Sequence, residues 1–279
     1  MPQTTFDPAV HGFAFANTWQ LDEEERRQLR EIFAPYLLWS GILGAVVFGL
    51  LGALLVPFVI PGVVALGLIG AVLFPLGILI LRRELERHLA PGYGLCGGMC
   101  FAALDFFNAK QAIPRGQGVN DQPAPRTHLR GYIWKRQMNS IVSDGARFAA
   151  WLFNLNYVPP AWPLRGGSDR LAARSRKEWE KLKAGVDAGD PVPIGLVYAT
   201  KHITDNHQVL AIGYDEENEA QSTIYVYDPN CPDTPSTIRL QFGEHALDGG
   251  GSCGTGPPLR GLFCEIYAPA DPTEALEPS

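Results

Sequence analysis

No long basic stripe occurs in this chain of 279 residues: 23 lysines and arginines stand against 29 aspartates and glutamates, and the net charge is −6. Nucleic-acid binding depends on a basic surface that neutralises phosphates, so we expect no nucleic-acid partner. Cysteines are also few, and their number, five, is odd. Because a secreted disulfide framework pairs its cysteines, we expect free thiols and a reducing compartment.

Spacings typical of a bound cofactor are missing as well. Cys96 and Cys100 lie four residues apart, but no second tightly spaced cysteine pair completes the four ligands of a structural zinc site. The glycine-rich stretch 249–254 lacks the lysine and the following helix of a phosphate-binding loop. We therefore predict neither a metal nor an organic cofactor.

Charged residues are absent from residues 37–81. The run consists of two apolar arms, residues 37–56 and 62–81, joined by a turn with Pro57 at its start and Pro61 at its end. A helix of about 20 residues spans a bilayer core of about 30 Å, which is the length of each arm. The sequence therefore predicts a two-helix transmembrane hairpin with the lipid bilayer as a partner.

The flanks of this hairpin predict its orientation. Three arginines shortly precede the first arm and three shortly follow the second, whereas the turn has no basic residue. Positive residues tend to stay cytosolic, so we expect an integral multi-pass membrane protein with both termini in the cytosol. Small residues at every fourth position of the first arm would admit a second helix, either the other arm or a homo-oligomeric partner. They are Gly41, Ala45, Gly49 and Ala53.

The remaining sequence divides into an N-terminal segment with an amphipathic helix (1–36), a domain (91–269) and a tail (270–279) predicted to be disordered. Residues 1–20 are expected to form a short extended piece docked on the domain. In the domain, helical periodicity precedes five strand-like runs. The helices are expected at 98–108, 129–153 and 177–188, and the strands at 193–198, 207–215, 223–227, 236–242 and 261–267. This order predicts an α+β fold with a mostly antiparallel sheet.

Three short segments carry residues suited to thiol chemistry. Cys96 lies on a glycine-rich turn that opens the first of these helices, His207 begins the second strand run, and Asp228 directly follows the third. The start of a helix favours a thiolate. A histidine at the start of one strand and an acid at the end of the next can meet across a sheet. The pattern predicts a nucleophile, its base and the group that orients the base.

These segments resemble the papain-like cysteine peptidases. The run Cys-Gly-Gly-Met-Cys-Phe-Ala-Ala from Cys96 resembles their nucleophile segment, and Asn206-His207 with its apolar continuation resembles their histidine strand. The run Tyr-Asp-Pro around Asp228 resembles the aspartate strand of the branch that includes the bacteriocin-leader (double-glycine) peptidases. The resemblance covers about residues 91–269. It implies an α+β papain-like cysteine-hydrolase domain with N-terminal helices and an antiparallel sheet, into whose chain the transmembrane hairpin is inserted.

The resemblance also implies an activity: hydrolysis of a peptide or isopeptide bond in a peptide or protein substrate by a Cys96–His207–Asp228 triad. With the orientation predicted above, the catalytic domain would lie in the cytosol. Two other functions are compatible with the same residues. One is an acyl transferase of the transglutaminase or deamidase type, and the other is a catalytically silent papain-like module that binds peptides at the membrane.

The sequence departs from the family pattern in two places. The family has two cysteines three residues apart, whereas Cys96 and Cys100 are four apart, so Cys100 remains an alternative nucleophile. The family also places a glutamine shortly before the nucleophile to bind the oxyanion, and residues 88–95 contain none. The donors would then be helix-start amides, such as that of Gly97, or Tyr93. Asn230 is a second residue able to orient the histidine.

One charged residue needs a structural explanation. Asp105 lies within the apolar run Ala103-Leu104-Asp105-Phe106-Phe107 of the first domain helix. We expect it to pair with Arg136 or to cap a loop.

Overall fold

The computed structural model describes residues 1–28, 31, 68–69, 71–73, 75–76, 79, 94–156, 167–198, 206–232, 234, 236–243, 247–249, 253 and 258–277. The chain divides into two compact units, Met1–Trp19 with Gly94–Ser279, and Gln20–Tyr93. The first unit contains all three predicted triad residues, and the fold below is that of this unit.

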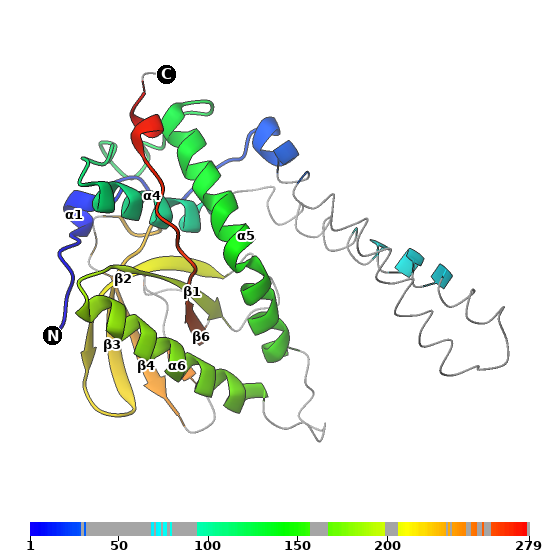
Figure 1. Cartoon of the computed structure of the whole chain (residues 1–279), viewed down its shortest axis with the longest axis vertical. Coiled ribbons are helices and arrows are strands. Elements are labelled where there is room, and N and C mark those ends of the chain that lie inside the picture. Colours follow the sequence, from blue (N-terminus) through cyan, green and yellow to red (C-terminus); the bar gives the residue numbers. More distant parts are fainter. Residues whose placement is uncertain are drawn as a thin grey trace. The chain divides into compact units, whose positions relative to one another are not determined.

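The described α-helices precede the strands in this unit, as the sequence predicts (Figure 1). The elements are α1 (Pro8–His11), α4 (Cys96–Ala109), α5 (His128–Asn156), α6 (Gly167–Asp187), β1 (Val192–Tyr198), β2 (His207–Glu216), β3 (Gln221–Tyr227), β4 (Ser236–Phe242), β5 (Leu247–Gly249), β6 (Leu259–Cys264) and the 3₁₀ helix η2 (Thr273–Leu276). Helix α6 starts ten residues earlier than predicted, because its first turns contain few apolar residues and so show no periodicity. The α+β part of the predicted fold is confirmed.

The strands form one antiparallel sheet in the order β1-β2-β3-β4-β5-β6. The sheet closes on itself, because β6 pairs with β1 along its length and with β5 through Gly249 and Leu259. Strand β4 buries every second residue, as expected of a strand with one solvent-facing side. The first eight residues of β2 are all buried, so both faces of this strand are covered.

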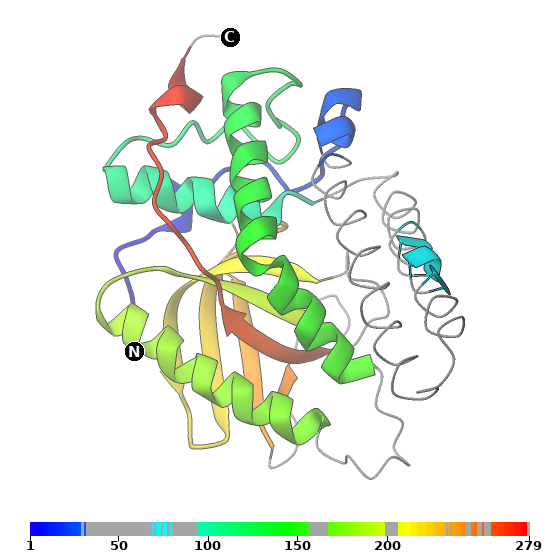
Figure 2. The same cartoon turned by 45° about the vertical axis from the view of Figure 1, so that its right-hand side comes forward.

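Two apolar clusters bury the side chains of the sheet. The larger cluster joins side chains from β1, β2, β3, β4 and β6 with Trp179, Leu182 and Val186 of α6. The smaller joins Phe148 and Trp151 of α5 to residues of β1 and β6. Helix α4 contacts both α5 and β2. Figures 1 and 2 show α6 crossing the strands, with α4 and α5 beside each other at another side of the sheet.

The N-terminal segment is part of this unit. Thr4 donates its amide to Ile212 O (2.8 Å), and Tyr214 donates its amide to Pro2 O (3.1 Å), so the segment runs antiparallel to the end of β2. Further on, the Phe13 amide donates to the hydroxyl of Tyr227 (3.2 Å). The expected docking of this segment is confirmed.

Asp105 is the centre of a buried polar cluster that links α4, α5 and the C-terminal segment. Its carboxylate lies 2.7 Å from Arg136 Nε and accepts hydrogen bonds from Tyr132 Oη (2.7 Å), Tyr267 Oη (2.6 Å) and the Ala270 amide (2.9 Å). The predicted pairing with Arg136 is confirmed. This explains how a carboxylate is tolerated in an apolar helix, since every partner compensates for lost hydration.

Replacing Asp105 by alanine is expected to lower the free energy of unfolding by about 3–5 kcal/mol, because it leaves the buried Arg136 guanidinium without its counter-charge. Chemical denaturation monitored by circular dichroism measures this change. Glu274→Ala is the matched control, because its ion pair with Lys135 is exposed and should contribute less than about 1 kcal/mol. Equal losses in the two variants would contradict the structural role of Asp105.

The predicted transmembrane hairpin at residues 37–81 is corrected here. Among the described residues, no helix combines the length and apolar character required to cross a bilayer. Only scattered helical residues between 68 and 79 of that stretch are described, and the first arm, the turn and the stripe Gly41, Ala45, Gly49 and Ala53 lie outside the described residues. An apolar run reports hydrophobicity and does not establish a continuous helix.

Three assignments depended on the hairpin and are withdrawn with it. They are the inserted transmembrane element of the fold, the multi-pass integral membrane protein, and the location of both termini and the catalytic domain in the cytosol. The α+β unit described above does not depend on any of them.

The tail predicted to be disordered is also different in the structure. Residues 270–277 carry the 3₁₀ helix η2, with Ala275 buried. Asp271 accepts hydrogen bonds from the amide and hydroxyl of Thr273, which stabilise the turn locally. The prediction of disorder is wrong for these residues because polar composition does not reveal such local bonds.

Candidate active site

Cys96 is the first residue of α4, and the two glycines after it allow the helix to begin in a crowded place. A Cβ on Gly97 would lie 2.1 Å from Gln208 Oε1, and one on Gly98 would lie 2.2 Å from Ile133 O. Only residues without side chains can therefore bring this turn against β2 and α5. Cys96 is buried, with 9% of its surface exposed.

Some of the backbone amides at the start of α4 already donate hydrogen bonds. Gly98 donates its amide to Gln137 Oε1 (2.8 Å), and Met99 donates to Leu95 O (2.8 Å). Among the hydrogen bonds between described residues, none uses the amide of Cys96 or Gly97. Amides in the first turn of a helix have no partner within the helix and can bind a negative charge. Gly97, predicted as an oxyanion donor, is the second residue of α4.

His207 and Asp228 meet because β2 and β3 are neighbouring antiparallel strands. His207 begins β2 and Asp228 follows the last residue of β3, so both lie at the same edge of the sheet. His207 Nε2 is 2.7 Å from Asp228 Oδ1, and both side chains are buried. The Asn230 amide donates to the same oxygen (2.7 Å) and holds the carboxylate in place.

The charge state of His207 follows from these contacts. Burial alone lowers its pKa, but the Asp228 carboxylate and a side-chain hydrogen bond with Cys96 outweigh burial and raise the pKa to about 10. His207 is therefore an imidazolium at neutral pH, in hydrogen-bonding contact with Cys96 on one side and Asp228 on the other. The structure brings the three predicted triad residues together.

The alternative nucleophile Cys100 lies in a different environment. It is one helical turn after Cys96, is fully buried, and has its Sγ 3.5 Å from Gln208 O. Burial raises the pKa of the Cys100 thiol well above its ordinary value, and the nearby Cys96, Glu265 and Asp228 raise it further. A neutral thiol enclosed in the core is unsuited to attack a substrate.

Asn17 and Asn230 connect the nucleophile turn to the aspartate turn. Asn17 Oδ1 accepts the amide of Leu95 (2.5 Å), while its Nδ2 donates to Asn230 Oδ1 (2.9 Å). The Asn17 amide also donates to Pro229 O (2.9 Å). Asn230 thus supports Asp228 through its backbone amide and contacts Asn17 through its side chain. Asn17 has no sequence signal, because its role arises only when the N-terminal segment docks. The predicted oxyanion donor Tyr93 lies outside the described residues.

A second group of polar residues lies near Cys96. Gln208 Oε1 is 3.8 Å from Cys96 Sγ, and Gln208 Nε2 donates to Ser140 Oγ (3.1 Å) and to Glu265 Oε1. Burial raises the pKa of Glu265 to about 8, although the Gln208 bond opposes the shift. Sequence reasoning missed these residues. The available signals were a glutamine next to His207 and a glutamate ending the apolar run of β6.

The Glu265→Gln variant is expected to change how stability depends on pH. The folded-state pKa of about 8 exceeds the ordinary 4.5, so the stabilisation from the bound proton is present below pH 4.5 and is lost as pH rises through 8. Relative to wild type, the variant should therefore gain about 2–5 kcal/mol between pH 4.5 and pH 8.5. Denaturation midpoints at the two pH values measure this. Glu274→Gln, an exposed control, should show no such gain, and a pH-independent difference for Glu265→Gln would contradict the assignment.

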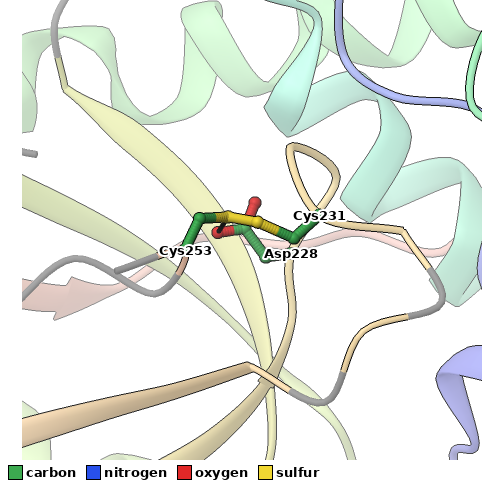
Figure 3. A group of neighbouring side chains, drawn as sticks. All are labelled: Asp228, Cys231 and Cys253. Atoms are coloured by element: carbon green, nitrogen blue, oxygen red, sulfur yellow. Dashed lines mark hydrogen bonds between the residues drawn. A yellow bond between two sulfur atoms is a disulfide. The ribbon is translucent and has the colours of Figure 1, made fainter. Parts of the chain in front are cut away.

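The cysteine prediction requires one correction. Cys231 and Cys253 form a disulfide, whereas Cys96, Cys100 and Cys264 are free (Figure 3). An odd number of cysteines excludes complete pairing but not a single bridge, so parity gave no valid argument against a disulfide or for a reducing compartment. The bridge joins the turn after β3 to the connection between β5 and β6, next to Asp228.

Comparisons of the chain with models of protein families, with curated proteins and with solved structures find no match. The class of the protein is therefore argued from the geometry of the site.

Proposed function

We propose that the protein is a cysteine hydrolase of the papain-like type, which cleaves a peptide or isopeptide bond through Cys96, His207 and Asp228. The observation that carries this proposal is the position of His207, which contacts a helix-start cysteine and a buried carboxylate at once. A thiol at a helix start beside a histidine that a buried carboxylate orients is the arrangement that activates a cysteine nucleophile.

The first half of the reaction uses the Cys96–His207 pair. The imidazolium and the helix-start amides stabilise a Cys96 thiolate, which attacks the carbonyl carbon of the substrate. The amides of Cys96 and Gly97 can donate to the oxygen that becomes negative in the tetrahedral intermediate. His207 then gives its proton to the leaving amine, and the acyl group remains on Cys96 as a thioester.

The second half releases the acyl group. Neutral His207 accepts a proton from water as the water attacks the thioester, and the thiolate–imidazolium pair is restored. Asp228 orients the ring through Nε2 and stabilises its positive charge, while Asn230 and Asn17 hold Asp228 and the nucleophile turn in register. Asp228 is thus the orienting residue of the proposed triad.

A peptide-library experiment tests this function. Wild-type protein incubated with a mixture of peptides should generate new amino termini, and Cys96→Ala should generate none. Cys264→Ala is the matched control, because Cys264 is a free cysteine whose Sγ contacts Glu178 O, away from the site. A free amine added to the mixture distinguishes the acyl-transferase alternative: amide products would replace the hydrolysed ones. Cleavage that persists in Cys96→Ala would refute the proposed nucleophile.

A further inference from the structure

Asp228 has a second set of neighbours at its other carboxylate oxygen. One carboxylate oxygen, Oδ1, is engaged by His207 and the Asn230 amide, while Oδ2 lies 3.2 Å from Cys253 Sγ. Figure 3 shows Asp228 beside the two sulfurs of Cys231 and Cys253. One oxygen of Asp228 and both sulfurs lie within 4.8 Å of one another.

The chemistry of this cluster is unusual because all three groups are hydrogen-bond acceptors in the oxidised state. A disulfide sulfur has no hydrogen, so Cys253 cannot donate to Asp228 while the bridge exists. When the bridge is reduced, two thiols face a buried carboxylate, and their thiolate forms would repel it. A cation between the three groups would convert this repulsion into attraction.

The spacing and the distances agree with metal coordination. Asp228 and Cys231 are three residues apart in a tight turn closed by the bond from the Cys231 amide to Asp228 O (3.0 Å), the separation of paired ligands in many zinc sites. Zinc binds thiolates at about 2.3 Å and carboxylates at about 2.0–2.2 Å, which places ligands on one ion roughly 3.3–3.8 Å apart. The 6.1 Å between the Cα atoms of Cys231 and Cys253 suits either a bridge or two ligands on one ion.

We infer that Asp228, Cys231 and Cys253 form a site for a thiophilic divalent cation such as Zn²⁺ when the two cysteines are reduced. Two thiols release two protons as the ion binds, and a fourth position remains for water. The disulfide and the metal exclude each other, because the bridge removes both thiolate ligands. Cys231 and Cys253 are only partly buried, so solvent can reach the sulfur side of the site. A phosphine supplies the two electrons that open the bridge, and one water molecule supplies the oxygen of the resulting phosphine oxide and the protons of the two thiols.

Metal binding at this site would act on His207. Asp228 would then share its negative charge between the imidazolium and the ion, so it would stabilise the imidazolium less. The binding site itself does not depend on the proposed function, because its ligands exclude Cys96 and His207, and its test measures metal rather than turnover.

The experiment titrates Zn²⁺ into the full chain against a chromogenic chelator, after reduction with a phosphine and its removal. All measurements use the Cys96→Ser variant, so that the proposed nucleophile cannot bind the metal. One zinc ion per reduced chain is expected. Both Cys231→Ser and Cys253→Ser should weaken binding by at least about 100-fold, beyond the 10–100-fold typical of residues that only support a ligand. Cys264→Ser should bind as its parent does.

Two further arms keep the inference falsifiable if one variant folds poorly. The oxidised chain, which needs no mutation, should not bind zinc at this affinity. Co²⁺ bound to the reduced chain should show thiolate-to-cobalt charge-transfer absorption that falls in either single-cysteine variant. Zinc binding by the oxidised chain, or undiminished binding in both folded cysteine variants, would overturn the site.

Discussion

Replacing His207 by alanine is expected to slow the alkylation of Cys96 by iodoacetamide at pH 5.5 by about tenfold or more. An ordinary thiol of pKa about 8.5 is only ~0.1% thiolate at this pH, so rapid alkylation at pH 5.5 requires the proposed thiolate–imidazolium pair. A stabilised thiolate is intrinsically less nucleophilic by about 10–100-fold, which leaves a net gain of about tenfold or more. His207 supplies the imidazolium because its pKa is raised to about 10.

The pH profile is more informative than one rate. With His207 present, the rate of Cys96 alkylation should change little between pH 5.5 and pH 8, because His207 stays an imidazolium until the pH rises through about 10. Without it, the rate should increase with pH as for an ordinary thiol. His128→Ala is the matched control, since His128 lies exposed at the start of α5 and its partner is Glu277. A wild-type profile that rises as steeply as that of the variant would refute the ion pair.

Substituting each cysteine of α4 separately should give the second large effect, on the labelling of the protein by a thiol-reactive probe. Cys96→Ser is expected to abolish labelling of the native protein by a peptidyl vinyl sulfone, because Cys96 is the thiol that interacts with His207. Cys100→Ser should retain labelling at more than about half of the wild-type rate, since Cys100 is fully buried and burial keeps its thiol neutral. Intact-mass measurement and mapping of the modified peptide distinguish the two positions.

A labelled Cys100 in the native protein would contradict this assignment and would move the nucleophile one turn into the helix. Because Cys100→Ser places a hydroxyl in the core, its folding should be checked by thermal denaturation. Cys100→Ala is the alternative variant if the serine destabilises the protein.

The sequence was informative where one-sided burial produces a regular pattern. Strand β4 alternates buried and exposed residues, and its predicted bounds agree with the structure. Strand β5 was missed because its three residues are too few to show alternation. The start of α6 was missed because a polar helical stretch does not differ in periodicity from a loop.

The candidate site divides in the same way. The meeting of His207 with Asp228 could be predicted, since the start of one antiparallel strand and the end of the next share an edge. The contacts of Asn17 and Glu265 could not, because they depend on how the N-terminal segment and the chain after β6 pack. Such contacts between distant segments leave no local pattern.

Two errors came from treating composition as structure. The uncharged run 37–81 gave the right length for two spanning helices, but length in residues does not establish a helix, and none of the described helices is suited to cross a bilayer. The odd count of cysteines likewise did not reveal that Cys231 and Cys253 are brought together by two connections of the same sheet. Both properties depend on three-dimensional arrangement.

An acyl-enzyme measurement tests the central claim most directly. The protein is mixed with a small activated ester, quenched in acid at increasing times, and its mass and the modified peptide are determined. The proposed chemistry predicts one acyl group on Cys96 that appears early and is released by water as the ester is consumed. Cys96→Ala should carry none, and His207→Ala should acquire and release it slowly. A wild-type protein that never carries an acyl group on Cys96, or that keeps it permanently, would contradict a thiol hydrolase.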